Sequence, residues 1–222
     1  MAKHFEKEIE KLKRKLLNLS SIVEDFVFKA VKSVEQRDEE LARSVVSNDN
    51  QVDDIEVDVE EECLKILALH QPVAIDLRIV IAILKINNDL ERIGDLACNI
   101  ADRAVSLSKR KRIGVIFPFA QMASKVKQML HESIVAFVNL DVNLARQICI
   151  ADKEVDAIHR DVHKLIEDNV KQSPEEIDAY LYYLSVSRNL ERIADHATNI
   201  AEDVIYMVDG EIVRHTHNSE KS

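Results

Sequence analysis

Residues 88–102 read NDLERIGDLACNIAD, and residues 188–202 read RNLERIADHATNIAE. Nine of these 15 aligned positions are identical at a constant separation of 100 residues. Typical residue frequencies would produce about one match by chance in a window of this length. The chain therefore contains an internal duplication, and its other features are compared between the two repeats.

A weaker repeat precedes each copy of this motif. It is separated by 103 residues and pairs Asp49, Val52, Asp53, Ile55, Asp58 and Val59 with Asp152, Val155, Asp156, Ile158, Asp161 and Val162. Pro72 and Pro174 follow the two stretches at nearly the same spacing. Both halves therefore share two consecutive elements and the break between them.

The composition favours long helices. Of 222 residues 46% are hydrophobic but only 5% aromatic, and the chain has three Gly, three Pro and no Trp. So few Gly and Pro residues leave room for only a handful of chain reversals. The opening segment places apolar or small residues at alternating steps of four and three, which is typical of a helix packed side by side with others: Phe5, Ile9, Leu12, Leu16, Leu19, Val23, Phe26 and Ala30.

Capping and breaking residues divide the chain into six helices. After a first helix of roughly 30 residues, we predict a second from Asp38 to about Leu69 and a third from Pro72 to the basic run at 109–112. Gly114 and Pro118 break the pattern. A fourth helix is predicted over 119–140, a fifth from the cap Asp141 to about residue 171, and a sixth from 173–174 to about 210.

The expected fold is all-α, with six long helices arranged as two tandem, duplicated three-helix bundles. We place the first bundle at residues 1–112 and the second at 113–210. Residues 211–222 are polar and are expected to form a flexible tail.

Charge and cysteine usage restrict the partners and the compartment. The net charge of −10 repels nucleic acid and anionic membranes, so neither is expected to bind. No apolar run approaches the ~18 residues of a membrane span, and no leader is recognisable. Cys63, Cys98 and Cys149 form no CxxC pair, which suits reduced thiols. We therefore predict a cytoplasmic protein without membrane insertion.

Each repeat carries two acidic pairs at spacing i, i+4, which places both carboxylates on one helix face. About seven such pairs would arise by chance from 40 acids in this chain, so only their recurrence at equivalent positions favours a site. All-oxygen ligation suits Fe, Mn, Mg or Ca. The metal candidates are Asp49, Asp53, Glu91, Asp95, Asp152, Asp156, Glu191 and Asp195.

Two alternatives stay open for these acids. They are either ligands of a metal or an acidic face paired with basic residues such as Arg92 and Arg192. The stripe continues at Asn99, Asp102, Asn199 and Glu202, which either complete a coordination sphere or merely decorate the helix. His196 points away from Asp195 on the helix, and a surface or packed role is favoured for it. His70 and His159 are interpreted as ordinary.

The twin motifs Leu90–Asp95 and Leu190–His196, together with the segment Gln71–Arg78, resemble the PhoU family of phosphate transport regulators. The resemblance implies a duplicated three-helix bundle whose acidic pairs hold metal clusters, one in each repeat, with iron or other ions. The first copy departs from the second at Gly94 and Leu96, so the two sites are expected to differ. The family is thought to restrain phosphate uptake by contacting the transporter's ATPase subunit and a membrane sensor histidine kinase. We also expect a homodimer.

Two other functions remain as alternatives. A metal-dependent enzyme, either a phosphohydrolase or a diiron protein, would use similar acidic helices, but diiron bundles usually carry Glu-x-x-His, and no His lies three residues after Glu91 or Glu191. No GxGxxG, P-loop, HExxH or GxSxG motif occurs. A metal-free coiled-coil interaction protein is the third possibility. We therefore expect a regulator that is not an enzyme.

Overall fold

The computed structural model describes residues 2–210, so the tail predicted at 211–222 lies outside the described residues. The described part contains helices and no strand. In chain order the elements are α1 (Ala2–Gln36), α2 (Glu39–Ser47), α3 (Asn50–His70), α4 (Ala74–Ser108), α5 (Phe119–Asn139), α6 (Val142–Val170), the 3-10 helix η1 (Pro174–Glu176) and α7 (Ile177–Asp209). The predicted all-α class is confirmed.

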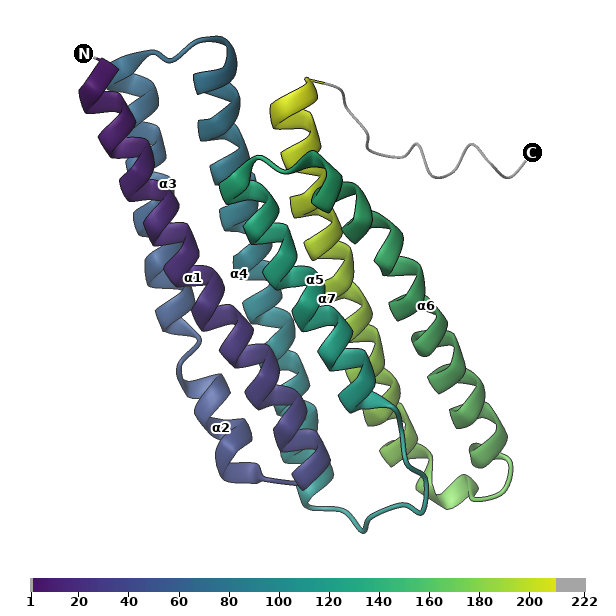
Figure 1. Ribbon diagram of the computed structural model, residues 1–222. Helices are drawn as coiled ribbons and strands as arrows, with labels where there is room; N and C mark the ends of the chain where they lie inside the picture. Colours follow the sequence, from purple (N-terminus) through teal and green to yellow (C-terminus); the bar gives the residue numbers. More distant parts are fainter. Residues whose placement is uncertain (1, 211–222) are drawn as a thin grey trace.

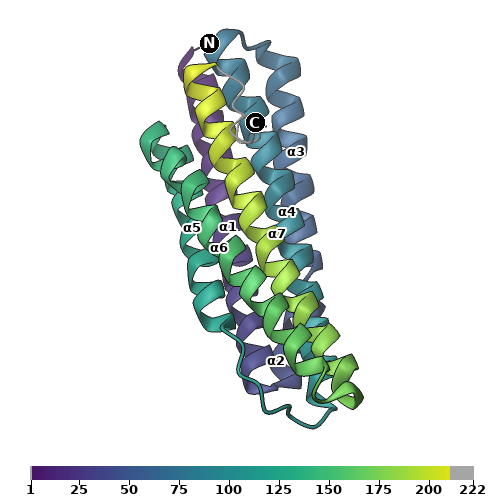
Figure 2. The same cartoon turned by 90° about the vertical axis from the view of Figure 1, so that its right-hand side faces the viewer.

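The helices form two three-helix bundles joined along their length. α1, α2 with α3, and α4 make the first bundle, and α5, α6 and α7 make the second (Figure 1). α4 and α7 pack against each other in the centre of the molecule, whereas α3 and α6 lie at its two edges (Figures 1 and 2). α4 and α7 run antiparallel, because Lys85 near the start of α4 contacts Asp203 near the end of α7.

The helix predicted over 38–69 is divided in the structure. α2 ends at Ser47, and α3 begins at Asn50 after a two-residue turn. Residues 47–50 read Ser-Asn-Asp-Asn, and such side chains compete with the helix for backbone hydrogen bonds. The Asn48 amide does so here, donating to the Ser44 carbonyl at 2.6 Å. The equivalent part of α6 is continuous, with Ala151 and Asp152 in its interior.

The turn between the first two helices is the same in both repeats. Arg37 and Leu140 adopt left-handed backbone conformations with φ of 60° and 56°. Asp38 and Asp141 follow them, and each accepts a hydrogen bond from the backbone N–H three residues on, at 2.9 and 3.0 Å. The predicted cap at Asp141 and the predicted helix start near Asp38 are therefore confirmed. The separation of 103 residues seen in the sequence extends to the end of each first helix.

The third helices begin later than predicted. Residues 71–73 are not helical, so Pro72 precedes α4 instead of opening it. Pro174 opens the short η1, and the Ser173 side chain makes no capping hydrogen bond. Proline explains both delays, since it lacks the N–H that a continuing helix needs and restricts the residue before it. Gly210 ends α7 in a left-handed conformation, as expected for a glycine after a helix.

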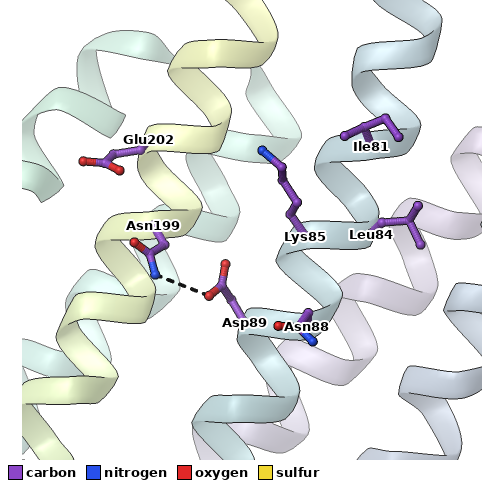
Figure 3. A pocket seen from close by; sticks show the side chains of 7 residues that line it. All are labelled: Ile81, Leu84, Lys85, Asn88, Asp89, Asn199 and Glu202. Carbon is purple, nitrogen blue, oxygen red and sulfur yellow. Dashed lines mark hydrogen bonds between the residues drawn. The ribbon is translucent and has the colours of Figure 1, made fainter. Parts of the chain in front are cut away.

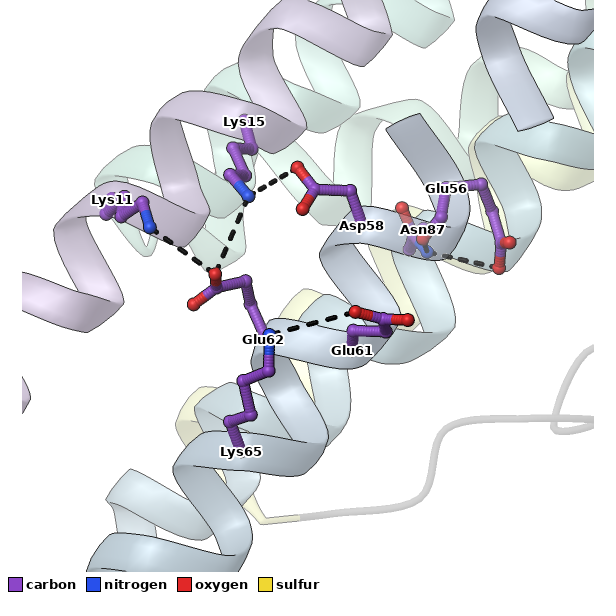
Figure 4. Close-up of polar contacts among 8 residues, drawn as sticks. All are labelled: Lys11, Lys15, Glu56, Asp58, Glu61, Glu62, Lys65 and Asn87. Carbon is purple, nitrogen blue, oxygen red and sulfur yellow. Dashed lines mark hydrogen bonds and ion pairs between the residues drawn. The ribbon is translucent and has the colours of Figure 1, made fainter. Parts of the chain in front are cut away.

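The apolar seam of α1 is buried, from Ile9 to Ala30, and only Phe5 lies at its margin. It packs on α4, and α4 with α7 supplies the centre of the core. Charged side chains cover the outside. Lys15 pairs with Asp58 and Lys11 with Glu62 between α1 and α3 (Figure 4). None of the described helices combines the length and the apolar character that crossing a membrane requires.

Burial of the twin motif predicts a large stability loss on truncation. Leu90 is fully buried, whereas Leu64 on α3 is 54% exposed. Leu90→Ala should lower the free energy of unfolding by about 3 kcal/mol, because a fully buried leucine leaves a cavity. Leu64→Ala should lower it by less than about 0.5 kcal/mol. Urea unfolding followed by circular dichroism measures both, and equal losses in the two variants would contradict this packing.

Candidate metal sites

Four acids from two helices come together in the second repeat. Asp152 and Asp156 lie on α6, and Glu191 and Asp195 lie on α7. Burial, followed by repulsion from Asp156, Asp195 and Glu191, raises the pKa of Asp152 to about 6. Asp195 lies at the surface, but partial desolvation, followed by repulsion from Glu191 and Asp156, raises its pKa to about 6. Carboxylates on facing helices are therefore close enough to oppose each other's ionisation.

The first repeat brings the equivalent acids together. Burial raises the pKa of Glu91 on α4, and the carboxylates of Asp95, Glu56 and Asp53 raise it further. Burial also raises the pKa of Asp95, with Asp49 and Asp53 on the α3 side adding to the effect. The eight predicted residues thus form two groups, each shared by the second and third helices of its repeat.

Arg92 makes the first group less negative than the second. Its guanidinium lies 3.3 Å from Glu91 Oε2 and 3.5 Å from Asp95 Oδ2, although Glu91 Oε2 is buried and accepts no hydrogen bond in the described part. These contacts of Arg92 are the ones expected if the acids form a face paired with basic residues. In the second group the only ion pair within 4.0 Å among the described residues is a long one, Arg160 to Asp156 at 3.9 Å. The two groups therefore differ mainly in how far basic side chains neutralise them.

Equivalent polar side chains flank the first acid of each group. Cys98 Sγ lies 3.2 Å from Asp49 Oδ1. Thr198, 100 residues later, lies near Asp152 and opposes the rise in its pKa, but its buried hydroxyl has no hydrogen-bond partner in the described part. Burial raises the pKa of the Cys98 thiol. In the absence of a metal ion, Cys98 is thus a neutral neighbour of the first group.

Sequence reasoning missed a second polar pair beside each group. In the first repeat the Asn87 amide donates to the Glu56 carbonyl at 2.9 Å and to its carboxylate at 3.2 Å (Figure 4). In the second repeat His159 and Ser187 occupy the equivalent positions, with 2.8 Å between Nδ1 and Oγ. The residue types differ completely, so identity between the repeats could not reveal the pair. The position of Asn87 could have revealed it, because Asn87 precedes Glu91 by one helical turn and so lies on the same helix face.

The residues proposed to extend the acidic stripe lie in different places. Asn99 and Asp102 are exposed on α4. Asn199 and Glu202 line an open groove between α4 and α7 with a volume of about 630 Å³ (Figure 3). There Asn199 Nδ2 lies 3.5 Å from Asp89 Oδ1 on α4, and His196 Nδ1 lies 2.8 Å from the same oxygen. His196 therefore bridges the two repeats.

The donor set of each group fits a hard cation better than a soft one. It consists of carboxylate oxygens with no thiolate, which suits Fe, Mn, Mg or Ca. As placed, no three His, Cys, Asp or Glu side chains within residues 2–210 are grouped closely enough to hold an ion. Sharing one would require the carboxylates to rotate toward each other. Among the described residues the second group makes only the long ion pair with Arg160, so basic side chains neutralise it less than Arg92 neutralises the first group.

A family model described as the PhoU domain matches this chain twice, over residues 16–104 and 119–204. Each match spans one bundle and includes one acidic group. The chain belongs to the PhoU family.

Several PhoU relatives match over nearly their whole length. A phosphate-specific transport system accessory protein PhoU homolog from Aquifex aeolicus is 37% identical over 215 residues, covering 97% of each chain. PhoU homolog 1 from Thermotoga maritima is 33% identical over 208 residues, covering 93% of this chain and 90% of the relative. The crystal structure of PhoU from Pseudomonas aeruginosa has a TM-score of 0.89 at 37% identity, covering 93% of this chain and 100% of that one. The resemblance inferred from the motifs is confirmed.

The raised pKa values predict a pH dependence for the metal-free protein. Asp152 and Asp195 bind protons more tightly when folded, with pKa values near 6 instead of the ordinary 3.8. The stability that they contribute is therefore present below about pH 4 and lost as the pH rises through 6. Asp152→Asn/Asp195→Asn should flatten this dependence.

Urea midpoints measured with a chelator at about pH 5 and pH 7.5 test this prediction. The fall in midpoint between the two pH values should be smaller in the double variant than in the parent. Asp58→Asn is the control, because Lys15 lowers the pKa of that carboxyl and its linkage has the opposite sign. An unchanged pH dependence in the double variant would refute the mutual repulsion of these acids.

Proposed function

We propose that this protein is a cytoplasmic PhoU-type regulator of phosphate transport and of phosphate-starvation signalling, and that it acts as a metal-binding adaptor and not as an enzyme. The relatives are named as accessory proteins of a phosphate-specific transport system. The observation that carries the metal part of the proposal is the convergence of four carboxylates between α6 and α7, two of them with pKa values near 6.

In this proposal Asp152, Asp156, Glu191 and Asp195 hold the metal in the second repeat. Asp49, Asp53, Glu91 and Asp95 are their counterparts in the first. A bound Fe, Mn, Mg or Ca ion, or a cluster of such ions, would neutralise these carboxylates and offer positions to a phosphate or to a partner's carboxylate. The side chains themselves tie the second helix of each repeat to the third.

The adaptor role follows from the shape of the molecule. Long helices packed along their length present extended, rigid faces, and the acidic groups lie between α3 and α4 and between α6 and α7. We propose that these faces serve docking to the transporter's ATPase subunit and to a sensor histidine kinase, and that the protein forms a homodimer. We further propose that the second repeat binds metal more tightly, because Arg92 already neutralises part of the first group.

Metal content tests the site assignment. Glu191→Gln/Asp195→Asn should remove more bound metal from the purified protein than Glu91→Gln/Asp95→Asn, and removing both pairs should leave none. Elemental analysis after dialysis in metal-free buffer measures this. Asp58→Asn/Glu62→Gln, which removes two acids of α3 that pair with lysines, is the control and should retain the metal. A parent protein without stoichiometric metal, even after reloading, would exclude both sites.

Repression of the phosphate-starvation response tests the function. In a host lacking the protein, the parent gene should restore low expression of a starvation reporter at high phosphate. The variant lacking both acidic pairs should leave the reporter active at equal protein level. The Asp58→Asn/Glu62→Gln control should behave like the parent. A reporter that ignores the parent gene would contradict the regulatory role, whatever the metal content.

A further inference from the structure

The face formed by α1 and α5 carries a groove that none of the acidic groups enters. Its volume is about 490 Å³, and it is lined by Val27, Phe28, Val31, Lys32, Glu35 and Gln36 of α1 and by Ala120, Ala123, Ser124 and Lys127 of α5. The two helices lie side by side at the front of the molecule in Figure 1. Val27 and Val31 form a buried floor, whereas Phe28 is 52% exposed. A half-exposed phenylalanine on an apolar floor is a potential anchor point for a partner side chain.

Two lysines converge on this ring. Lys32 Nζ of α1 lies 5.9 Å from the Phe28 ring centroid, and Lys127 Nζ of α5 lies 5.5 Å from it. Such contacts contribute only about 0.5–1 kcal/mol each at exposed positions. Among the described residues neither ammonium has a carboxylate within 4.0 Å. The two lysines outnumber Glu35, the one carboxylate that lines the groove, so the patch carries a net positive charge in a chain whose net charge is −10.

The neighbouring turn of the α1–α5 contact carries a different pair of residues. With the 103-residue separation of the repeat, Phe28 corresponds to His131 and Lys127 to Glu24. Those two residues face each other, with 3.4 Å between His131 Nδ1 and Glu24 Oε1. Two adjacent turns thus differ, because one carries a polar pair and the next presents an exposed ring between two cations.

The groove continues toward the connection between the repeats. Glu35 lines both it and a neighbouring cavity of about 320 Å³. That cavity includes Arg112, from the basic run at 109–112, and Ile116, which is 92% exposed. The two cavities therefore adjoin at Glu35, and their linings combine apolar, basic and acidic side chains.

We propose that the α1–α5 groove docks an acidic amphipathic helix of a partner protein, with an apolar side chain packed on Phe28 and carboxylates at Lys32 and Lys127. Two neighbouring helices form the kind of groove that accepts the apolar face of a third. The positive local charge favours an acidic partner, and it predicts an association rate constant that falls as the salt concentration rises. The inference rests on the proposed function, because it assigns a surface to the docking of a regulated partner. A second copy of this chain is less suitable, since a groove meeting a different surface generates an open assembly.

The chemistry of the groove is tested with a defined probe. The probe is a capped helical peptide of about 15 residues, long enough to hold its helix, with Leu at positions i, i+4 and i+7 and Glu around them. Fluorescence anisotropy should show saturable binding to the full chain. The same peptide with Lys in place of Glu should bind about tenfold more weakly. The groove variant is Phe28→Ala/Lys32→Glu/Lys127→Glu, and it should bind the acidic peptide about tenfold or more weakly than the parent. Lys127→Glu alone should weaken this binding by a smaller factor.

A matched control removes similar groups elsewhere. Leu181→Ala/Lys65→Glu/Lys164→Glu deletes a leucine that is 55% exposed and reverses two exposed lysines, and it should bind the acidic peptide like the parent. Absence of saturable binding, or equal binding by the groove variant, overturns the proposal. Self-association lost in the groove variant, without peptide binding, would assign the groove to a second copy. Binding only to phosphatidylglycerol vesicles would assign it to a membrane surface.

The purified ATPase subunit and the kinase's cytoplasmic domain separate this inference from the proposed function. If the parent binds neither protein but binds the acidic peptide through the groove, the transporter role fails and the groove assignment stands. If either protein binds the parent and the groove variant equally, regulation stands and the groove is not its docking surface. Loss of that binding in the groove variant alone, with the control unchanged, supports both.

Discussion

The antiparallel packing of α4 against α7 is the contact on which the rest of the molecule depends. Both helices carry the twin motif, whose apolar residues are buried while its acids face the neighbouring helix of the same repeat. The apolar side holds the two bundles together and the acidic side forms the candidate metal sites. Because both sides belong to one rigid helix, the position of each acidic group is determined by the packing of the core.

Small differences between the repeats make the two acidic groups unequal. At Gly94 an added Cβ would lie 3.2 Å from Val52 Cγ1, so the glycine permits a close approach of α3 to α4. The second repeat has Ala194 at the equivalent position. The break between α2 and α3 places Asp49 at the start of a helix, whereas Asp152 lies inside one. Arg92 then neutralises part of the first group. The duplication therefore supplies two acidic groups with the same residue types and different electrostatics.

The same duplication yields two surfaces of opposite character. The acidic groups lie between the second and third helices of each repeat, and the α1–α5 groove joins the two first helices. At this contact the repeat symmetry is broken, since Phe28 and Lys127 in one turn correspond to His131 and Glu24 in the next. With metal in the acidic groups and a partner in the α1–α5 groove, the protein would keep its metal sites and its docking surface apart, as an adaptor requires.

The sequence by itself determined the helical class, the duplication, the aspartate cap at Asp141 and the division of the eight acids into two groups. These features depend on local rules: periodicity, hydrogen bonding by a side chain to its own turn, and identity between repeats. Tertiary structure decided the rest. The break at Asn48, the pairing of Glu56 with Asn87, the bridge from His196 to Asp89 and the cations around Phe28 all depend on contacts between helices far apart in the chain. No local pattern encodes those contacts, because which faces meet is set by how whole helices pack.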